Sequence, residues 1–200
     1  DSYTIGEVEV TEFRRSSDGM QSFGTDVLKT SPDVSGGSVE AMISTMAGVN
    51  SSNEMSSQYS VRGGSYDENS VYINGVEIYR PQLVRSGQQE GLSIINPDMV
   101  GNIKFSTGGF PAQYSDKMSS VLDITYREPE ALEGSASFSL MGASLAFGQN
   151  SGKFSQLHGI RFKKNNSLLT SLETKGEYDP LYFDYQTSIN YKPTDKWTIS

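Results

Sequence analysis

The stretch that decides the fold of this chain runs from Tyr59 to Tyr79 and reads Tyr-Ser-Val-Arg-Gly-Gly-Ser-Tyr-Asp-Glu-Asn-Ser-Val-Tyr-Ile-Asn-Gly-Val-Glu-Ile-Tyr. Near its end, Asn74-Gly75 stands between two alternating apolar segments. This dipeptide tolerates the two positive φ angles of a type I′ turn, whose twist matches that of paired strands. The sequence therefore predicts a tight hairpin with four apolar side chains on one face, against a core: Val71, Ile73, Val76 and Ile78. The other face should carry Tyr72, Glu77 and Tyr79.

Short elements surround this hairpin. Ser38 can cap a helix whose apolar residues recur at i, i+3, i+4 and i+7 and which ends at Gly48. Pro97 suits the first turn of a second, short helix. The other expected elements are strands at 58–62, 103–105 and 122–126, and a strand or turn at 26–29. Residues 13–126 should therefore form a small mixed α+β domain, preceded by a short strand within residues 1–12.

The pattern changes after a linker at 127–133. From residue 134 to 200, long segments alternate apolar and polar residues, and hairpin-sized connections join them. We expect four strands and the start of a fifth: 134–148 with a bulge at Gly142, 153–164, 168–178, 181–192 and 197–200. Strands of about 11 to 15 residues approach the length that a tilted strand needs to cross a bilayer. An amphipathic sheet lying on a soluble core is the alternative.

Composition excludes several classes of function. The 200 residues include no Cys and a single His, which removes thiolate metal sites, Cys nucleophiles and His-based triads. A net charge of −8 with interspersed bases argues against a nucleic-acid partner. No apolar run approaches the roughly 20 residues of a membrane-spanning helix. The run Asp67-Glu68-Asn69 offers too few oxygen donors for a calcium loop. We therefore expect no enzyme, no metal and no cofactor, and a hydrolase is the least favoured alternative.

Four ordered blocks resemble the plug domain of TonB-dependent outer-membrane receptors, most of all those of the Bacteroidota-like type. They are YSVRGG at 59–64, NSVYINGVEIY at 69–79, GGFPAQY at 108–114 and SSVLDI at 119–124. The resemblance covers roughly Val8 to Thr125. It implies an α+β plug domain followed by the first antiparallel strands of a 22-stranded transmembrane β-barrel. Because four strands and a fraction cannot close a barrel, we expect the sequence to be a fragment.

The resemblance also implies a function and a location. Such receptors import scarce nutrients across the bacterial outer membrane, including iron chelates, haem, cobalamin, peptides and glycans, while the plug gates the barrel lumen. The expected partners are TonB of the inner-membrane energising complex, outer-membrane lipid, the nutrient and a surface lipoprotein. A plug-like surface module that binds or signals without transport is the alternative. The identity of the substrate is not written in this sequence.

The N-terminal strand is the candidate TonB box. In this family such a segment adds as a strand to the sheet of TonB. The candidate residues are Ile5, Gly6, Glu7, Val8, Glu9 and Val10. The alternative interpretation is that Val8 and Val10 only begin the sheet of the plug.

Two further sets of residues follow from the resemblance. Arg62 matches the Arg-Gly position of the family, where the guanidinium is implicated in holding the plug to acidic groups of the barrel wall. A solvated Arg at a strand end is the alternative. Loops at the outer apex of the plug would meet the substrate, and the candidates there are Asn50, Asn53, Tyr66, Glu68, Tyr79, Arg80, Arg85 and Gln88.

Overall fold

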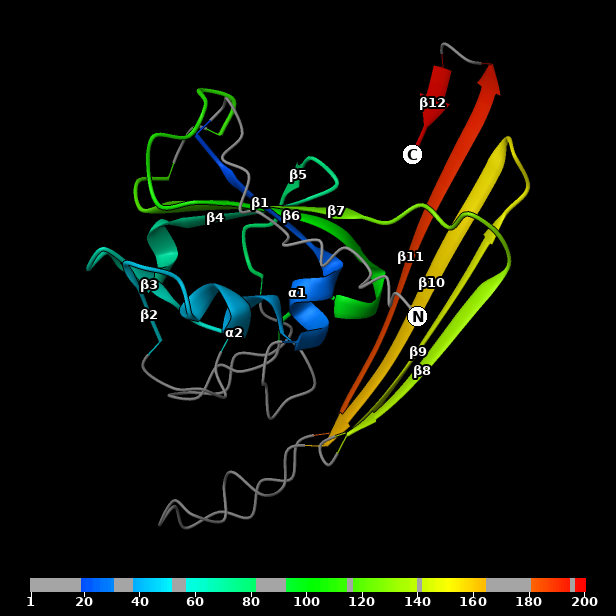
Figure 1. Cartoon of the computed structure of the whole chain (residues 1–200), viewed down its shortest axis with the longest axis horizontal. Coiled ribbons are helices and arrows are strands. Elements are labelled where there is room, and N and C mark those ends of the chain that lie inside the picture. Colours follow the sequence, from blue (N-terminus) through cyan, green and yellow to red (C-terminus); the bar gives the residue numbers. More distant parts are fainter. Residues whose placement is uncertain are drawn as a thin grey trace, which may run out of the picture.

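The computed structural model describes residues 19–30, 38–51, 57–81, 93–114, 117–139, 142–164, 181–194 and 197–200. Figure 1 shows two bodies side by side: a mixed sheet with helices on one face, and a set of long strands. We call residues 19–126 the N-terminal domain and the strands after residue 132 the strand wall. No helix of the described residues is long and apolar enough to cross a membrane.

The N-terminal domain is built on a five-stranded sheet with the order β1-β6-β7-β4-β5. β4 and β7 are parallel, and the other neighbours are antiparallel. The elements are β1 (Gln21–Gly24), α1 (Thr25–Thr30), α2 (Val39–Ser44), β2 (Val49–Asn50), β3 (Ser60–Val61), η1 (Tyr66–Glu68), β4 (Asn69–Ile73), β5 (Val76–Glu77), η2 (Pro97–Met99), β6 (Val100–Ser106) and β7 (Ser120–Tyr126). β2 and β3 form a separate two-stranded sheet. The expected class, a small mixed sheet with short helices followed by antiparallel strands, is confirmed.

The predicted hairpin is confirmed in its turn and its register. Asn74 and Gly75 have φ angles of 51° and 79°, and Ile73 pairs with Val76. The prediction of a single buried face was wrong. Val76 at the tip is 63% exposed, whereas Tyr72 on the opposite face packs against a second apolar cluster. Both faces of β4 are covered because the main core packs on the side of Val71 and Ile73, and the second cluster packs on the side of Tyr72.

Helix α2 begins as the sequence predicts. The Ser38 hydroxyl accepts a hydrogen bond from the Ala41 N–H at 3.0 Å, and Gly48 has a φ of 83° after the helix. The apolar face of α2 packs into the main core, which also contains β6 and β7 residues and one residue of the strand wall, Leu157. The segment 26–29, expected as a strand or turn, is instead part of helix α1, because β1 ends directly before it.

The strand wall is an antiparallel sheet in the order β12-β11-β10-β9-β8. Its strands are β8 (Glu133–Ser139), β9 (Gly142–Asn150), β10 (Phe154–Lys164), β11 (Leu181–Thr194) and β12 (Trp197–Ile199). The single bulged strand expected at 134–148 was wrong. β8 and β9 form a hairpin in which Ser139 pairs with Gly142. The parity of the apolar residues changes there because the chain reverses.

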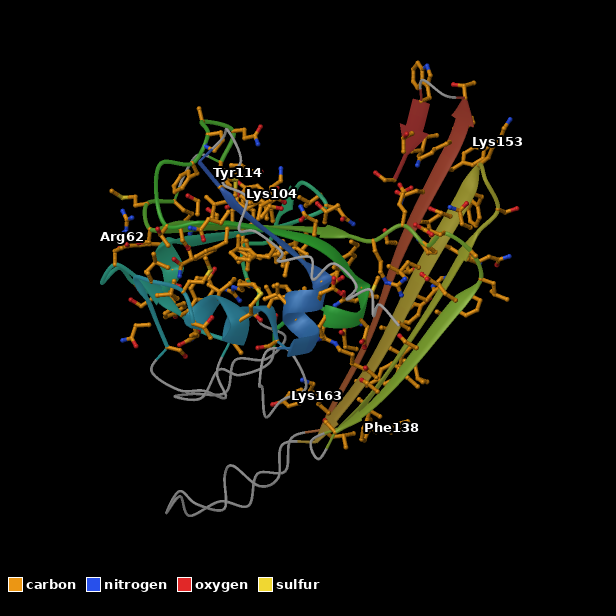
Figure 2. The ribbon with its side chains drawn as sticks, in the orientation of Figure 1. Arg62, Lys104, Tyr114, Phe138, Lys153 and Lys163 are labelled. Atoms are coloured by element: carbon orange, nitrogen blue, oxygen red, sulfur yellow. The ribbon has the colours of Figure 1, made fainter. Side chains whose placement is uncertain are left out.

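Alternation gives the strand wall two different faces. The inner face, toward the N-terminal domain, is mostly polar or small apart from Leu157, and the outer face carries exposed apolar side chains: Phe138, Leu145, Phe147, Ile160, Phe162, Phe183, Tyr185 and Ile189. In Figure 2, Phe138 points away from the N-terminal domain. The expected strand at 168–178 lies outside the described residues. Since β10 pairs directly with β11, no strand separates them in the sheet.

Candidate functional site: a clamp between the domain and the wall

Arg161 of β10 reaches from the strand wall into the N-terminal domain. Residues 155, 157, 159 and 161 of β10 face inward and are buried. The guanidinium of Arg161 donates hydrogen bonds to three consecutive backbone carbonyls: Ile95 at 2.7 Å, Ser93 at 3.1 Å and Ile94 at 3.2 Å. These three hydrogen bonds go to the main chain, so they fix the backbone of segment 93–95 whatever side chains that segment carries. A planar fork with several donors suits this task.

Asp184 balances the charge of Arg161. The two residues pair directly in the β10–β11 register, and the Nε of Arg161 donates to the Asp184 carboxylate at 2.9 Å. Their side chains are 4% and 9% exposed, so both charges have left bulk water. Such a pair persists only if hydrogen bonds compensate the lost hydration. The three carbonyls and the carboxylate provide that compensation here.

Two neighbours extend the contact. The side-chain amide of Gln186 donates to the Ile94 carbonyl, which Arg161 also contacts. The hydroxyl of Tyr126, at the end of β7, donates to the Gln186 side-chain oxygen at 2.6 Å. Burial raises the pKa of Tyr126, which keeps its phenol protonated and able to donate. We call this set of hydrogen bonds around segment 93–95 the clamp.

Gly159 forms a notch in the wall beside the clamp. A Cβ placed on Gly159 would lie 2.4 Å from the Asn96 side-chain nitrogen and 2.6 Å from the Met99 sulfur. Both of those side chains are fully buried, so they have little room to move. The lack of a side chain at residue 159 therefore lets η2 sit against β10.

Replacing Gly159 with alanine should loosen this seat. Overpacking a filled core costs about 1–3 kcal/mol, and the buried side chains of Asn96 and Met99 would have to shift. Limited proteolysis of the full-length protein should therefore cleave the N-terminal domain faster in Gly159→Ala. The matched control is Gly134→Ala on β8, where a new Cβ meets its nearest atom at an ordinary 3.7 Å. Equal cleavage rates in the two variants would contradict the notch.

A buried carboxyl lies behind the clamp. Glu40, in the first turn of α2, is 4% exposed, and one of its oxygens accepts a hydrogen bond from the Ser93 hydroxyl. Its other oxygen has no partner among the described residues. Burial raises the pKa of Glu40, although the Ser93 bond and the charges of Arg161 and Lys163 oppose the shift. Helix α2 is thereby connected to the same segment that the wall holds.

The linker is fixed to the wall as well. Arg127 forms an ion pair with Glu133 and donates to the Asp98 carbonyl at 3.1 Å. The Asn150 side chain donates to the Pro129 carbonyl at 2.8 Å. The N-terminal domain is therefore attached to the wall both at the clamp and at its own C-terminal end.

Arg62, the predicted lock residue, lies elsewhere. It follows β3 with a φ of 51°, its side chain is exposed, and its N–H donates to the Gly48 carbonyl at 2.8 Å. Figure 2 shows it on the side of the N-terminal domain away from the strand wall. Among the described residues, the arginine contact between the wall and the N-terminal domain is made instead by Arg161 of the wall itself, and Arg127 of the linker pairs with Glu133 of β8. The sequence shows Arg161 as a charged residue of an alternating strand, and the β10–β11 register of the structure sets it opposite Asp184.

The substrate-apex candidates do not form one described cluster. Tyr66 and Glu68 lie in η1, where the Glu68 carboxylate accepts a hydrogen bond from Ser119 at 2.6 Å. Asn50 is exposed at the end of β2, and Tyr79 and Arg80 are exposed after β5. The remaining candidates lie outside the described residues: Asn53, Arg85 and Gln88. The candidate TonB box, Ile5 to Val10, also lies outside them. Within the described residues, no group of three His, Asp or Glu side chains could hold a metal ion.

Comparison with known proteins supplies the context for this geometry. The family model described as TonB-dependent Receptor Plug Domain matches residues 14–120, which is more than half of the chain. None of the curated proteins matches this chain.

Two solved structures share the fold at low sequence identity. The outer membrane transporter YddB from Escherichia coli matches with a TM-score of 0.65 and 12% identity over 90% of this chain. The ferric enterobactin receptor PfeA, in complex with BCV-L6, matches with a TM-score of 0.58 and 16% identity over 91% of this chain. The match covers 32% of each of those two chains, so this chain spans about a third of their length.

Proposed function

Because the chain belongs to the family of TonB-dependent receptor plug domains, we propose that it gates the import of a nutrient across the bacterial outer membrane, where its family resides. The N-terminal domain acts as the plug, and the strand wall supplies the first strands of the surrounding barrel, expected to have 22 strands in all. This role involves no catalysed reaction.

The clamp is the observation that carries this proposal. A sheet with an apolar outer face and a polar inner face suits a barrel wall in lipid, with the outer face toward the hydrocarbon. The plug packs on the inner face, and Arg161 holds its backbone there at three carbonyls. Because Leu157 of the wall is part of the core of the plug, the plug packs directly on β10 at this point. Passage of a nutrient on this side therefore requires the plug to leave the clamp.

Energy for that movement would come from TonB. In the proposal, Ile5 to Val10 pair with a strand of TonB, where main-chain hydrogen bonds supply binding that withstands a pull. Pulling on this segment would draw the adjoining plug away from the wall. Arg62 is proposed as a second lock, toward parts of the barrel other than β8–β12.

Deleting Ile5 to Val10 tests this assignment. We expect energy-dependent uptake to fall to the background of a strain without the receptor, because the plug can no longer be pulled. Binding of the same nutrient to whole cells should stay unchanged, since the deletion leaves the clamp and the apex loops intact. The control is a deletion of equal length within 13–18, which should spare uptake. Normal uptake without Ile5 to Val10 would refute the TonB box.

The substrate is proposed only by class. Iron chelates, haem, cobalamin, peptides and glycans all remain candidates, and one structural neighbour is named as a receptor for ferric enterobactin. Ferric chelates are therefore the first class to test in binding assays. The candidate contacts are exposed polar residues of the plug, among them Asn50, Tyr79 and Arg80. A surface lipoprotein is a further proposed partner.

A further inference from the structure

Helix α2 is connected to the strand wall by one continuous chain of polar contacts. The Ser93 hydroxyl donates to Glu40 of α2, and the Ser93 carbonyl accepts from Arg161 of β10. Arg161 in turn pairs with Asp184 of β11. The hydroxyl of Ser93 also accepts from the Ile95 N–H at 3.0 Å, which fixes the turn that presents the carbonyls. Any change at Glu40 therefore acts on the segment that the wall holds.

The charges around Glu40 do not balance if it is ionised. Arg161 and Asp184 neutralise each other, so a carboxylate at residue 40 would add an unpaired negative charge to a buried cluster. Lys163 of β10 is half-buried and offsets that charge only in part. In Figure 2, Lys163 points from the wall toward the N-terminal domain.

Among the side chains that the structure describes, Arg161 and Lys163 are the cations near Glu40. Tyr59, before β3, is a buried phenol whose pKa is raised by burial, so it stays neutral. Asp26 of α1 is exposed and acidic, and α2 contains no ionisable residue besides Glu40. The surroundings of Glu40 therefore favour the neutral carboxylic acid. The neutral acid needs no counter-ion, and its oxygen without a partner costs less to bury than the same oxygen of a carboxylate.

We propose that Glu40 is a positioning residue of the clamp: as a neutral acid it holds Ser93 and its neighbours on Arg161, and its ionisation loosens that hold. The proton goes to water when α2 separates from segment 93–95 and Glu40 becomes hydrated. Opening the clamp therefore releases a proton, and acidic conditions keep the plug seated. Only the biological consequence of the proposal rests on the proposed gating role, because the stability of the closed clamp can be measured without transport.

The direction of the pH dependence follows from the raised pKa. A carboxyl whose pKa is higher in the closed clamp than its usual 4.5 binds its proton more tightly when the clamp is closed. The closed clamp is then most stable near and below pH 4.5 and loses stability as pH rises through the raised pKa. Above that pKa the loss is complete, and the dependence becomes flat.

Hydrogen exchange of the full-length protein, without TonB or nutrient, tests the proposal. Protection factors of the peptide covering residues 93–99, corrected for the intrinsic pH dependence of exchange, should fall between pH 5 and pH 8. The fall should be about tenfold for each unit by which burial raises the pKa of Glu40. In Glu40→Gln, whose amide is always neutral, the fall should disappear, and protection at pH 8 should exceed that of the wild type.

Two controls separate this role from a merely structural one. Glu77→Gln changes a half-buried carboxyl elsewhere in the domain and should keep the wild-type pH profile. Glu40→Ala removes the Ser93 bond altogether and should lower protection at both pH values. A wild type with no pH dependence, or a Glu40→Gln variant that retains it, would overturn the proposal. Because TonB and nutrient are absent, these results stand even if the protein does not import.

Discussion

Replacing Arg161 with alanine is expected to weaken the attachment of the plug to the wall by about 3–5 kcal/mol. Removing one partner of a buried ion pair leaves the other charge uncompensated, and costs of this size are typical. Here the substitution strands the Asp184 carboxylate, which is 9% exposed, and takes the donor from the carbonyls of Ser93, Ile94 and Ile95. The inner face of β10 then loses its principal polar contact with the plug.

Hydrogen exchange measures this loss directly. A weakening of 3 kcal/mol corresponds to more than about a hundredfold drop in the protection of residues 93–99 in the full-length protein, since 1.4 kcal/mol is tenfold. The matched control is Lys192→Ala, which breaks an ion pair with Glu128 whose side chains are both 44% exposed. Exposed pairs of this kind contribute about 0–1 kcal/mol.

A double variant distinguishes the buried charge from the lost hydrogen bonds. In Arg161→Ala with Asp184→Asn, the stranded negative charge is absent, so the loss should be smaller than in Arg161→Ala alone. If residues 93–99 are as well protected from hydrogen exchange in Arg161→Ala as in Lys192→Ala, the clamp is not what holds the plug to this wall.

Much of the fold could be predicted because local rules decide it. The Asn74-Gly75 turn, the Ser38 cap and the Pro97 start of η2 each depend on a few adjacent residues, and each appears in the structure. The alternation of β11 likewise predicts its two faces. Features that depend on residues distant in the sequence are harder to predict from the sequence. The exposure of Val76 at the hairpin tip and the packing of Tyr72 follow from which distant residues lie beside them.

The clamp itself was missed for a related reason. Arg62 stands in the YSVRGG motif, whereas Arg161 stands in no motif and looks like an ordinary polar residue of an alternating strand. Two facts about β10 and β11 would have identified it: the inward parity of residue 161, and the register that sets it opposite Asp184. Residues 165–180 separate the two strands in the sequence, so adjacent residues alone do not define their register. The reversal at Gly142 could have been predicted, because apolar parity changes there.

A reversible covalent tether between plug and wall tests the central claim most directly. The chain has no Cys, so Met99→Cys with Gly159→Cys introduces a single pair. The Met99 Cγ, whose place a cysteine sulfur would take, lies 3.0 Å from the ideal Cβ position of residue 159. A disulfide needs about that separation between one sulfur and the far Cβ. Each single cysteine variant serves as a control that cannot form the tether, and Gly159→Cys alone also measures the effect of the new Cβ beside Asn96.

Uptake by cells that carry the double variant is the decisive measurement. If the plug gates import by leaving the wall at the clamp, uptake should fall to background when the disulfide is formed and return on reduction. Nutrient binding should persist in both states, because the tether lies inside the plug–wall contact. Uptake that continues at the wild-type rate with the disulfide fully formed would contradict a gate at this contact.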